Sequence, residues 1–182
     1  MAAIDNDKGW IERSLRGDHQ AFESLVAKYQ HMIHALTFRM TGSRADAEDL
    51  AQETFIQAHQ RLASYRAEAR FSSWLYRIAL NHCLNWKSRN QRRERLQEDW
   101  RQEAESSPAP NDALALEVQN ALMQLHPKQR AAVALTLYDG LNHAEAARVL
   151  GCSETTVSWR LFTARAKLKR LLRKVPGTGG CS

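Results

Sequence analysis

Apolar residues recur every three or four positions along almost the whole chain, and this spacing constrains the fold more than any other feature. Phe22, Leu25, Tyr29 and Ile33 begin the clearest stripe, which predicts a helix over about 19–40. Further helices are predicted over about 45–62, 73–93 and 112–124, from Pro127 onwards, and as a final pair separated by Gly151. Because only eight glycines and four prolines are present, a loop-rich β fold is disfavoured. We predict an all-α protein.

Several helix ends carry their own sequence signals. Asp18 is placed to cap the first long helix, and Gly42 is placed to end it in a left-handed turn. Pro127 suits the first position of a helix, and Gly140 suits a left-handed stop.

The charge distribution divides the chain in two. The net charge is +6, but residues 61–101 hold ten basic and four acidic side chains, and residues 148–174 hold eight basic and one acidic. Between them, residues 99–117 hold five acids and one base and include the stretch SSPAPND, which resists helix formation. We predict two small helical domains, 9–96 and 113–175, joined by a flexible acidic linker, 97–112, and followed by a disordered tail, 176–182.

Composition argues against several classes of protein. Cys83, Cys152 and Cys181 lie far apart with no CxxC pair, which disfavours a disulfide framework and a self-contained zinc site. No apolar run approaches the roughly 20 residues that cross a bilayer, and the N-terminus has no hydrophobic signal core. We also find no P-loop, dinucleotide fingerprint or catalytic triad. We expect a cytoplasmic protein without a disulfide framework or a self-contained zinc site.

The segment 141–168 has the features of a helix-turn-helix. Asn142 and Glu145 predict a capping box, and Ser153 is the predicted cap of a second helix after the Gly151 turn. On that helix the predicted core stripe is Val157, Leu161, Ala164 and Leu168, and the free side presents Thr155, Trp159, Phe162 and Thr163 between the flanking Ser158, Arg160, Arg165 and Lys167. Such a free side suits the major groove, with cations on phosphates. The alternative is a generic helical hairpin with a solvated basic face.

The helix over 45–62 has an acidic face. Ala47, Ala51, Phe55, Ala58 and Leu62 form its predicted inward stripe, and Asp46, Asp49, Leu50, Glu53, Gln57 and Gln60 form the other face. Oxygen-rich side chains can bind a cation, but Leu50 lies at the centre of the face and no ExxH motif accompanies it. A surface that docks another protein, or a solvated surface, is the favoured interpretation.

The helix over 73–93 combines aromatic, amide and basic side chains. Trp74, Arg77, Asn81, Leu84 and Ser88 are predicted to point outward, and Lys87, Arg89, Arg92 and Arg93 follow. Rings that stack on bases and cations that follow the backbone suit single-stranded nucleic acid. The alternative is that the aromatics belong to the core and the arginines solubilise the surface.

In order along the chain, the segments GDHQAFESLVAKYQHMI, DAEDLAQETFIQAHQRLASYR and FSSWLYRIALNHCLNW, with the terminal helix-turn-helix, resemble bacterial extracytoplasmic-function (ECF, group IV) sigma factors of the sigma-70 family. The resemblance covers about 9–174. It implies a sigma-2 helical bundle and a sigma-4 helix-turn-helix domain without an intervening sigma-3 domain. It also implies a factor that binds core RNA polymerase through the β′ clamp helices and β flap, directs promoter-specific transcription initiation, and is controlled by an anti-sigma factor. Such a factor is not an enzyme and needs no cofactor or metal.

The resemblance assigns roles to individual residues. The polymerase contact would involve Asp46, Asp49, Leu50, Gln52 and Glu53. The minus-10 element would be bound by Tyr65, Arg66, Trp74, Arg77, Asn81, Lys87, Arg89, Arg92 and Arg93, with the loop 65–70 and Asn81 capturing a flipped base. The minus-35 element would be bound by Thr155, Thr156, Ser158, Trp159, Arg160, Phe162, Thr163 and Lys167. This sequence departs from relatives that carry Arg at the positions of Ser158 and Thr163 and a small residue at that of Trp159. The departure bears on which minus-35 sequence is bound, not on the docking mode.

Two other classes of function remain open from the residues. A conventional helix-turn-helix regulator would bind duplex DNA alone, usually as a dimer at palindromic half-sites. A metal-dependent nuclease or phosphotransferase would use the acids of 46–53 to hold a cation. The regulator would leave the acidic face of the helix over 45–62 unexplained. The metal-dependent enzyme would need tight cation binding.

Overall fold

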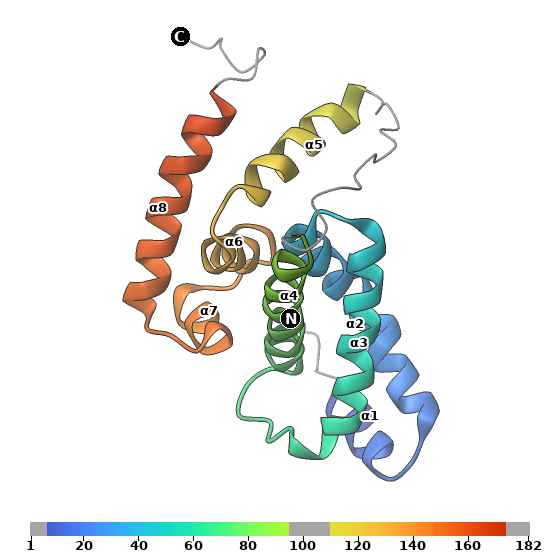
Figure 1. The fold of residues 1–182 in the computed structure, drawn as a ribbon. Coiled ribbons are helices and arrows are strands. Elements are labelled where there is room, and N and C mark those ends of the chain that lie inside the picture. The colour runs from blue at the N-terminus through green and yellow to red at the C-terminus, as the bar shows by residue number, and fades with distance from the viewer. Residues whose placement is uncertain (1–6, 95–109, 174–182) are drawn as a thin grey trace.

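The computed structural model describes residues 7–94 and 110–173, and every regular element in these ranges is a helix. The N-terminal body consists of α1 (Asp7–Leu15), α2 (His19–Thr41), α3 (Arg44–Arg61), the 3-10 turn η1 (Leu62–Ser64) and α4 (Phe71–Glu94). The C-terminal body consists of α5 (Pro110–Met123), α6 (Pro127–Val133), the π-helical η2 (Ala134–Tyr138), α7 (His143–Leu150) and α8 (Glu154–Leu172) (Figure 1). The all-α prediction is confirmed. Most of the predicted linker and the whole predicted tail lie outside the described residues.

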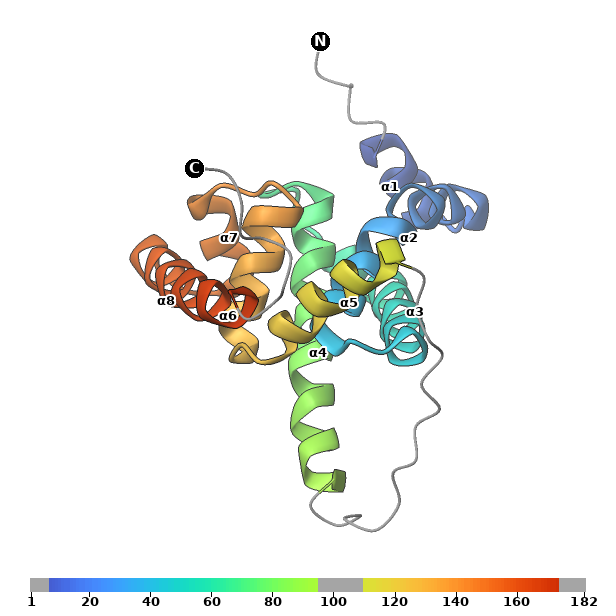
Figure 2. The same cartoon turned by 90° about the horizontal axis from the view of Figure 1, so that it is seen from above.

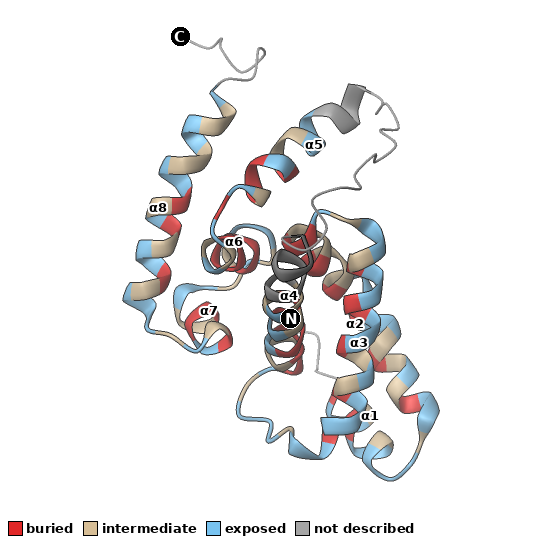
Figure 3. Ribbon diagram, viewed as in Figure 1, coloured by how far each residue is buried: buried red, intermediate tan, exposed pale blue. Residues whose placement is uncertain are grey.

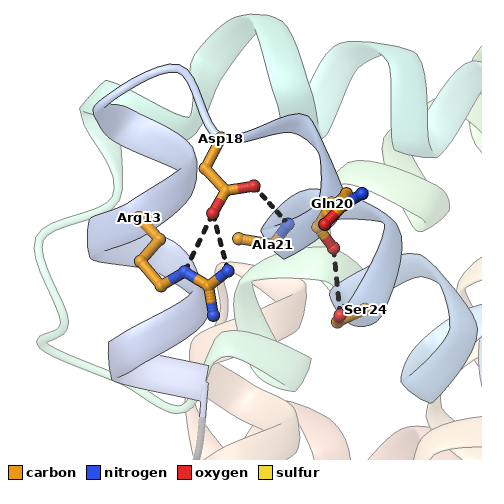
Figure 4. A network of polar contacts seen from close by, with 5 residues as sticks. All are labelled: Arg13, Asp18, Gln20, Ala21 and Ser24. Atoms are coloured by element: carbon orange, nitrogen blue, oxygen red, sulfur yellow. Dashed lines mark hydrogen bonds and ion pairs between the residues drawn. The ribbon is translucent and has the colours of Figure 1, made fainter.

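Local sequence signals set the helix ends as expected. Asp18 accepts a hydrogen bond from the Ala21 backbone N–H at 3.2 Å and also pairs with Arg13, whose Nε lies 2.9 Å away (Figure 4). This pairing with Arg13 is the main reason that the pKa of Asp18 lies below its usual value. Gly42 ends α2 in the left-handed conformation, at φ 78°. Capping by Asp18 and termination at Gly42 are both confirmed.

Helix α1 was not predicted, and a buried carboxylate holds it in place. Asp7 is 3% exposed and accepts hydrogen bonds from Lys28 Nζ, at 2.6 Å, and from Tyr29 Oη. Ile11 adds the one buried apolar side chain of α1. Because α1 is anchored by polar contacts more than by an apolar stripe, periodicity gave no signal for it.

Helix α4 belongs to the N-terminal body and also contacts the C-terminal body. It packs against α2 and α3 on one side and against α7 on another, and Figure 2 shows it near the middle of the molecule. Tyr76, Leu80 and Cys83 are therefore buried together with Leu75 and Ile78. Figure 3 shows buried positions on the helices of both bodies, mainly where the helices face one another. Helix α4 is therefore buried on more than one side.

Arg130 joins the two bodies and is completely buried. Its guanidinium donates to the backbone carbonyl of Met40, at 2.5 Å, and to those of Leu122, Met123 and Leu125, at 2.8, 2.5 and 3.2 Å. Carbonyls in the last turn of a helix lack partners within the helix and carry the negative end of its dipole. One cation therefore satisfies the ends of both α2 and α5. Burial lowers the pKa of Arg130 to about 10, so it remains charged at neutral pH.

A second contact closes the C-terminal body onto α2. Arg39 Nη1 lies 3.1 Å from Asp139 Oδ1, and the Arg39 guanidinium stacks 4.5 Å from the centre of the Tyr138 ring. Burial raises the pKa of Asp139, while the pairing with Arg39 acts in the opposite direction. Asp139 directly follows η2, so the wide π turn sets where this carboxylate meets α2.

Candidate nucleic-acid interfaces

A cavity of about 990 Å³ lies where the loop after η1 faces α7. Its walls combine residues of α1, the 64–70 loop, α4 and α7: Asp7, Lys8, Ile11, Glu12, Ser64, Tyr65, Arg66, Ala67, Glu68, Ala69, Arg70, Ser73, Trp74, Arg77, Glu145, Arg148 and Val149. The volume is at the upper end of that of small-molecule pockets. Five basic and four acidic side chains line it, so both bodies contribute charges of both signs.

Three packed aromatic rings hold the 65–70 loop. The ring centres of Tyr65 and Phe71 are 5.3 Å apart, and Trp74 lies 5.5 Å from Tyr65 and 5.4 Å from Phe71. Tyr65 Oη donates to the carbonyl of Ala69 at 2.7 Å, across a turn in which Ala67 has a left-handed backbone, at φ 55°. Trp74 is thus half-buried against the core, not fully outward as predicted.

The structure unites only part of the predicted minus-10 set. Tyr65, Arg66, Trp74 and Arg77 line the cavity. Asn81 is exposed one turn further along the face of α4 that carries Trp74 and Arg77, and it is not among the lining residues. Lys87, Arg89, Arg92 and Arg93 belong to the last turns of α4, where the side chains lie outside the described part.

The polar residues on the acidic face of α3 are exposed or half-buried, but its apolar residue, Leu50, is buried. Asp49, Gln52 and Glu53 are exposed and Asp46 is half-buried, whereas Leu50 is 4% exposed and belongs to the hydrophobic core. The prediction that Leu50 lies at the centre of an open face is therefore wrong. With 3.6 residues per turn, a position at the edge of a stripe is enclosed when the neighbouring helix approaches from that side.

Acidic clustering on α3 does not create a metal site. Within residues 7–94 and 110–173, no three His, Cys, Asp or Glu side chains are grouped closely enough to hold an ion. Glu53 instead contacts His82 of α4, with 3.3 Å between Oε2 and Nδ1. The same ranges contain no helix that is long and apolar enough to cross a membrane.

The helix-turn-helix consists of α7 and α8. Asn142 and Glu145 form the predicted capping box, Gly151 is left-handed at φ 61°, and Ser153 accepts a hydrogen bond from the Thr156 backbone N–H at 3.2 Å. Val157, Leu161 and Ala164 are buried, and Leu168 packs beside them. These predictions are confirmed.

The predicted minus-35 side chains of α8 fall into two groups. Trp159 is 62% and Phe162 is 73% exposed, and Thr155 is exposed beside them. The others already contact their own body: Thr156 pairs with Ser153, Ser158 with His143, Arg160 with Cys152, Thr163 with Gln129, and Lys167 with the carbonyl of Gln124. Recognition by the first group would need no rearrangement of those contacts.

The contacts that join the bodies are the main feature that sequence reasoning missed. A lone Arg130 or Arg39 on an amphipathic helix is indistinguishable from a solvated cation, and their partners are 90 and 100 residues away. Capping and periodicity report only on neighbours within about one turn, so neither signal could have identified these residues.

Comparisons with known proteins agree with this architecture. Residues 25–93 match the family "Sigma-70 region 2", and residues 115–168 match "Sigma-70, region 4". The chain is 33% identical to the RNA polymerase sigma-H factor of Pseudomonas aeruginosa, over 95% of this chain and 97% of that one. It is 36% identical to the ECF RNA polymerase sigma factor SigM of Mycobacterium tuberculosis, over 92% of this chain and 85% of that one.

Two solved structures share the arrangement of both bodies. CnrH in complex with the cytosolic domain of CnrY has a TM-score of 0.71 and 29% identity, over 93% of this chain and 99% of that one. The sigma factor RpoE in complex with the anti-sigma factor NepR, from Bartonella quintana, has a TM-score of 0.72 over 84% of this chain and 96% of that one. At 24% identity, the second likeness concerns the fold alone.

Proposed function

Because the chain belongs to the ECF branch of the sigma-70 family of RNA polymerase sigma factors, we propose that it is a group IV factor that binds core polymerase and directs promoter-specific initiation. The observation that carries this proposal is the pairing of a region 2 bundle with a helix-turn-helix whose second helix presents an open face. Polymerase supplies the chemistry of RNA synthesis, and this chain supplies promoter recognition without catalysis. The working units are 9–96 and 113–175, with 97–112 as the connecting linker.

The N-terminal body captures the melted minus-10 strand. A base extruded from the duplex loses stacking worth a few kcal/mol, and stacking on an aromatic side chain returns about 1–3 kcal/mol. Tyr65 and Trp74 offer such rings at the 65–70 loop, Asn81 offers an amide to a base edge, and Arg66 and Arg77 offer cations to the backbone. The packed ring cluster supports this role because it holds the loop in one shape before DNA arrives.

The acidic face of α3 contacts polymerase. Asp49, Gln52 and Glu53 are exposed on one helix, with Asp46 at its first turn. Leu50 contributes from beneath as core support for this surface. We assign the partner as the clamp helices of the β′ subunit, and the flap of the β subunit as the contact of the C-terminal body.

The two bodies share the cavity proposed for the minus-10 base. Glu145, Arg148 and Val149 of α7 line it together with the 65–70 loop, so the relative position of the bodies shapes this site. A cognate anti-sigma protein that binds both bodies and holds the promoter-binding surfaces away from DNA would keep the factor inactive. The likeness to CnrH, whose structure was solved with the cytosolic domain of CnrY, supports such a partner.

Run-off transcription tests the proposal. Core RNA polymerase is incubated with a pool of promoter fragments, with and without this protein, and the transcripts are sequenced. Specific initiation only in the presence of the protein is the expected result, and the enriched fragments then define both promoter elements. Absence of initiation, combined with tight duplex binding by the protein alone, would instead assign a conventional helix-turn-helix regulator.

A further inference from the structure

Trp159 and Phe162 form an exposed aromatic pair on α8. They lie three residues apart, so they are neighbours on one face of the helix, and they are the two most exposed large hydrophobic side chains in the described part of the chain. The opposite face is the buried stripe of Val157, Leu161 and Ala164. The pair therefore points away from its own body, in the first half of the helix that follows the Ser153 cap.

The polar neighbours of this pair have partners within the protein. Ser158 Oγ lies 3.0 Å from His143 Nδ1. Thr163 Oγ1 accepts a hydrogen bond from Gln129 Nε2 at 2.9 Å and donates within its own helix to the Trp159 carbonyl at 2.9 Å. Hydroxyl groups fixed in this way are poor candidates for new bonds to base edges. The groups left to contact bases at this point of the helix are mainly aromatic.

The exposed cations of α8 indicate that the aromatic pair, Trp159 and Phe162, faces DNA. Arg165, Lys169, Arg170 and Arg173 are exposed on the second half of the helix and its end, where cations suit phosphates. In the major groove, the one apolar group on a base edge is the C5-methyl of thymine, which accepts contacts from apolar side chains. The cationic second half of α8 thus suits the phosphates of a DNA duplex, and its aromatic first half suits thymine methyl groups in the major groove.

We infer that Trp159 and Phe162 determine minus-35 specificity by contacting thymine methyl groups. This inference rests on the proposed function and specifies the chemistry of its C-terminal site. The minus-35 element of this factor then contains thymines whose methyl groups face α8.

Replacing thymine by uracil tests the inference, because it removes the methyl group and leaves the hydrogen-bonding edge unchanged. The holoenzyme is bound to the minus-35 duplex obtained from the transcription experiment, with deoxyuridine at each thymine in turn. Replacing a contacted thymine by deoxyuridine is expected to lower the affinity about three- to fivefold, the loss expected for one buried methyl group. In the double variant Trp159→Ala, Phe162→Ala, the ratio of thymine to uracil affinity should fall to about one.

Two matched variants separate methyl recognition from general DNA binding. Arg170→Ala should weaken binding to all sequences and leave the thymine-to-uracil ratio at its wild-type value, as expected for a phosphate contact. Phe162→Leu keeps an apolar side chain and should retain most of the ratio. Equal affinity for thymine and uracil duplexes, with normal initiation, would overturn the inference and assign the pair to a protein contact. A ratio unchanged in the double variant would also overturn it. Failure to initiate at any promoter would overturn the proposed function itself.

Discussion

The two bodies place aromatic side chains in the surfaces proposed for DNA, but they hold them in different ways. In the N-terminal body, Tyr65, Phe71 and Trp74 pack ring against ring within 5.5 Å. In the C-terminal body, Trp159 and Phe162 stand open to solvent. A packed cluster gives a loop one shape, which suits the capture of a single base, whereas exposed rings on a rigid helix suit a continuous groove. We propose that similar residues serve two kinds of recognition because their packing differs.

The largest loss of stability is expected when Arg130, whose guanidinium joins the two bodies, is replaced. Arg130→Met should lower the free energy of unfolding by about 3–5 kcal/mol, because buried carbonyls at the ends of α2 and α5 lose a charged donor. Urea unfolding followed by circular dichroism measures the loss. Arg165→Met on the exposed side of α8 is the control and should change stability by no more than about 0.5 kcal/mol. A loss below about 1 kcal/mol for Arg130→Met would show that water replaces the guanidinium.

A change at Asn81 should separate promoter opening from polymerase binding. Asn81→Ala is expected to reduce open-complex formation roughly 10- to 100-fold, because a bidentate contact to a base is worth about 1–3 kcal/mol. Permanganate reactivity of thymines in the minus-10 region measures opening, and gel filtration measures association with core polymerase. Gln30→Ala, an exposed amide on α2, should affect neither. Equal loss of opening and association in Asn81→Ala would refute the assigned role.

Reversing a charge on α3 should affect assembly without changing DNA specificity. Asp49→Arg is expected to weaken the complex with core polymerase about tenfold or more, since it reverses a charge within the surface proposed to contact polymerase. A competition assay against the wild-type factor measures the difference. Glu23→Arg makes the same charge change at an exposed position of α2 and should compete like wild type. Normal competition by Asp49→Arg would remove α3 from the polymerase interface.

The smallest effect is expected from the described cysteines, one in each body. Cys83 is buried on α4, and burial raises the pKa of its thiol to about 12. At pH 8 the reactive thiolate of Cys83 is scarce, so alkylation followed by peptide mass spectrometry should label the half-buried Cys152 first. In urea the two rates should converge. Rapid labelling of native Cys83 would contradict its enclosure in the packed core.

Local signals in the sequence were sufficient to predict the helix caps and the helix-turn-helix of this molecule. Asp18, Asn142 and Ser153 cap their helices as expected, because a cap involves side chains and backbone within three residues. The helix-turn-helix and its exposed aromatics followed from periodicity for the same reason. Each of these features depends only on chain neighbours.

The features that sequence reasoning missed depend on how the bodies meet. Leu50, Tyr76 and Leu80 are buried because a helix can be covered on more than one side, and periodicity identifies only its most apolar side. Arg130 and the Arg39–Asp139 pair connect positions 90 and 100 residues apart. Their sequence signal is that of ordinary surface cations, and only the packed structure distinguishes them.

One measurement tests most directly whether the two bodies recognise DNA in two different forms. Holoenzymes with wild-type factor, with Asn81→Ala and with Trp159→Ala, Phe162→Ala are compared on one promoter by footprinting, with minus-35 protection and minus-10 permanganate reactivity recorded in the same samples. We predict that Asn81→Ala keeps minus-35 protection and loses minus-10 melting, whereas the aromatic double variant loses minus-35 protection first. Parallel loss of both signals in both variants would contradict the division of duplex and single-strand recognition between the two bodies.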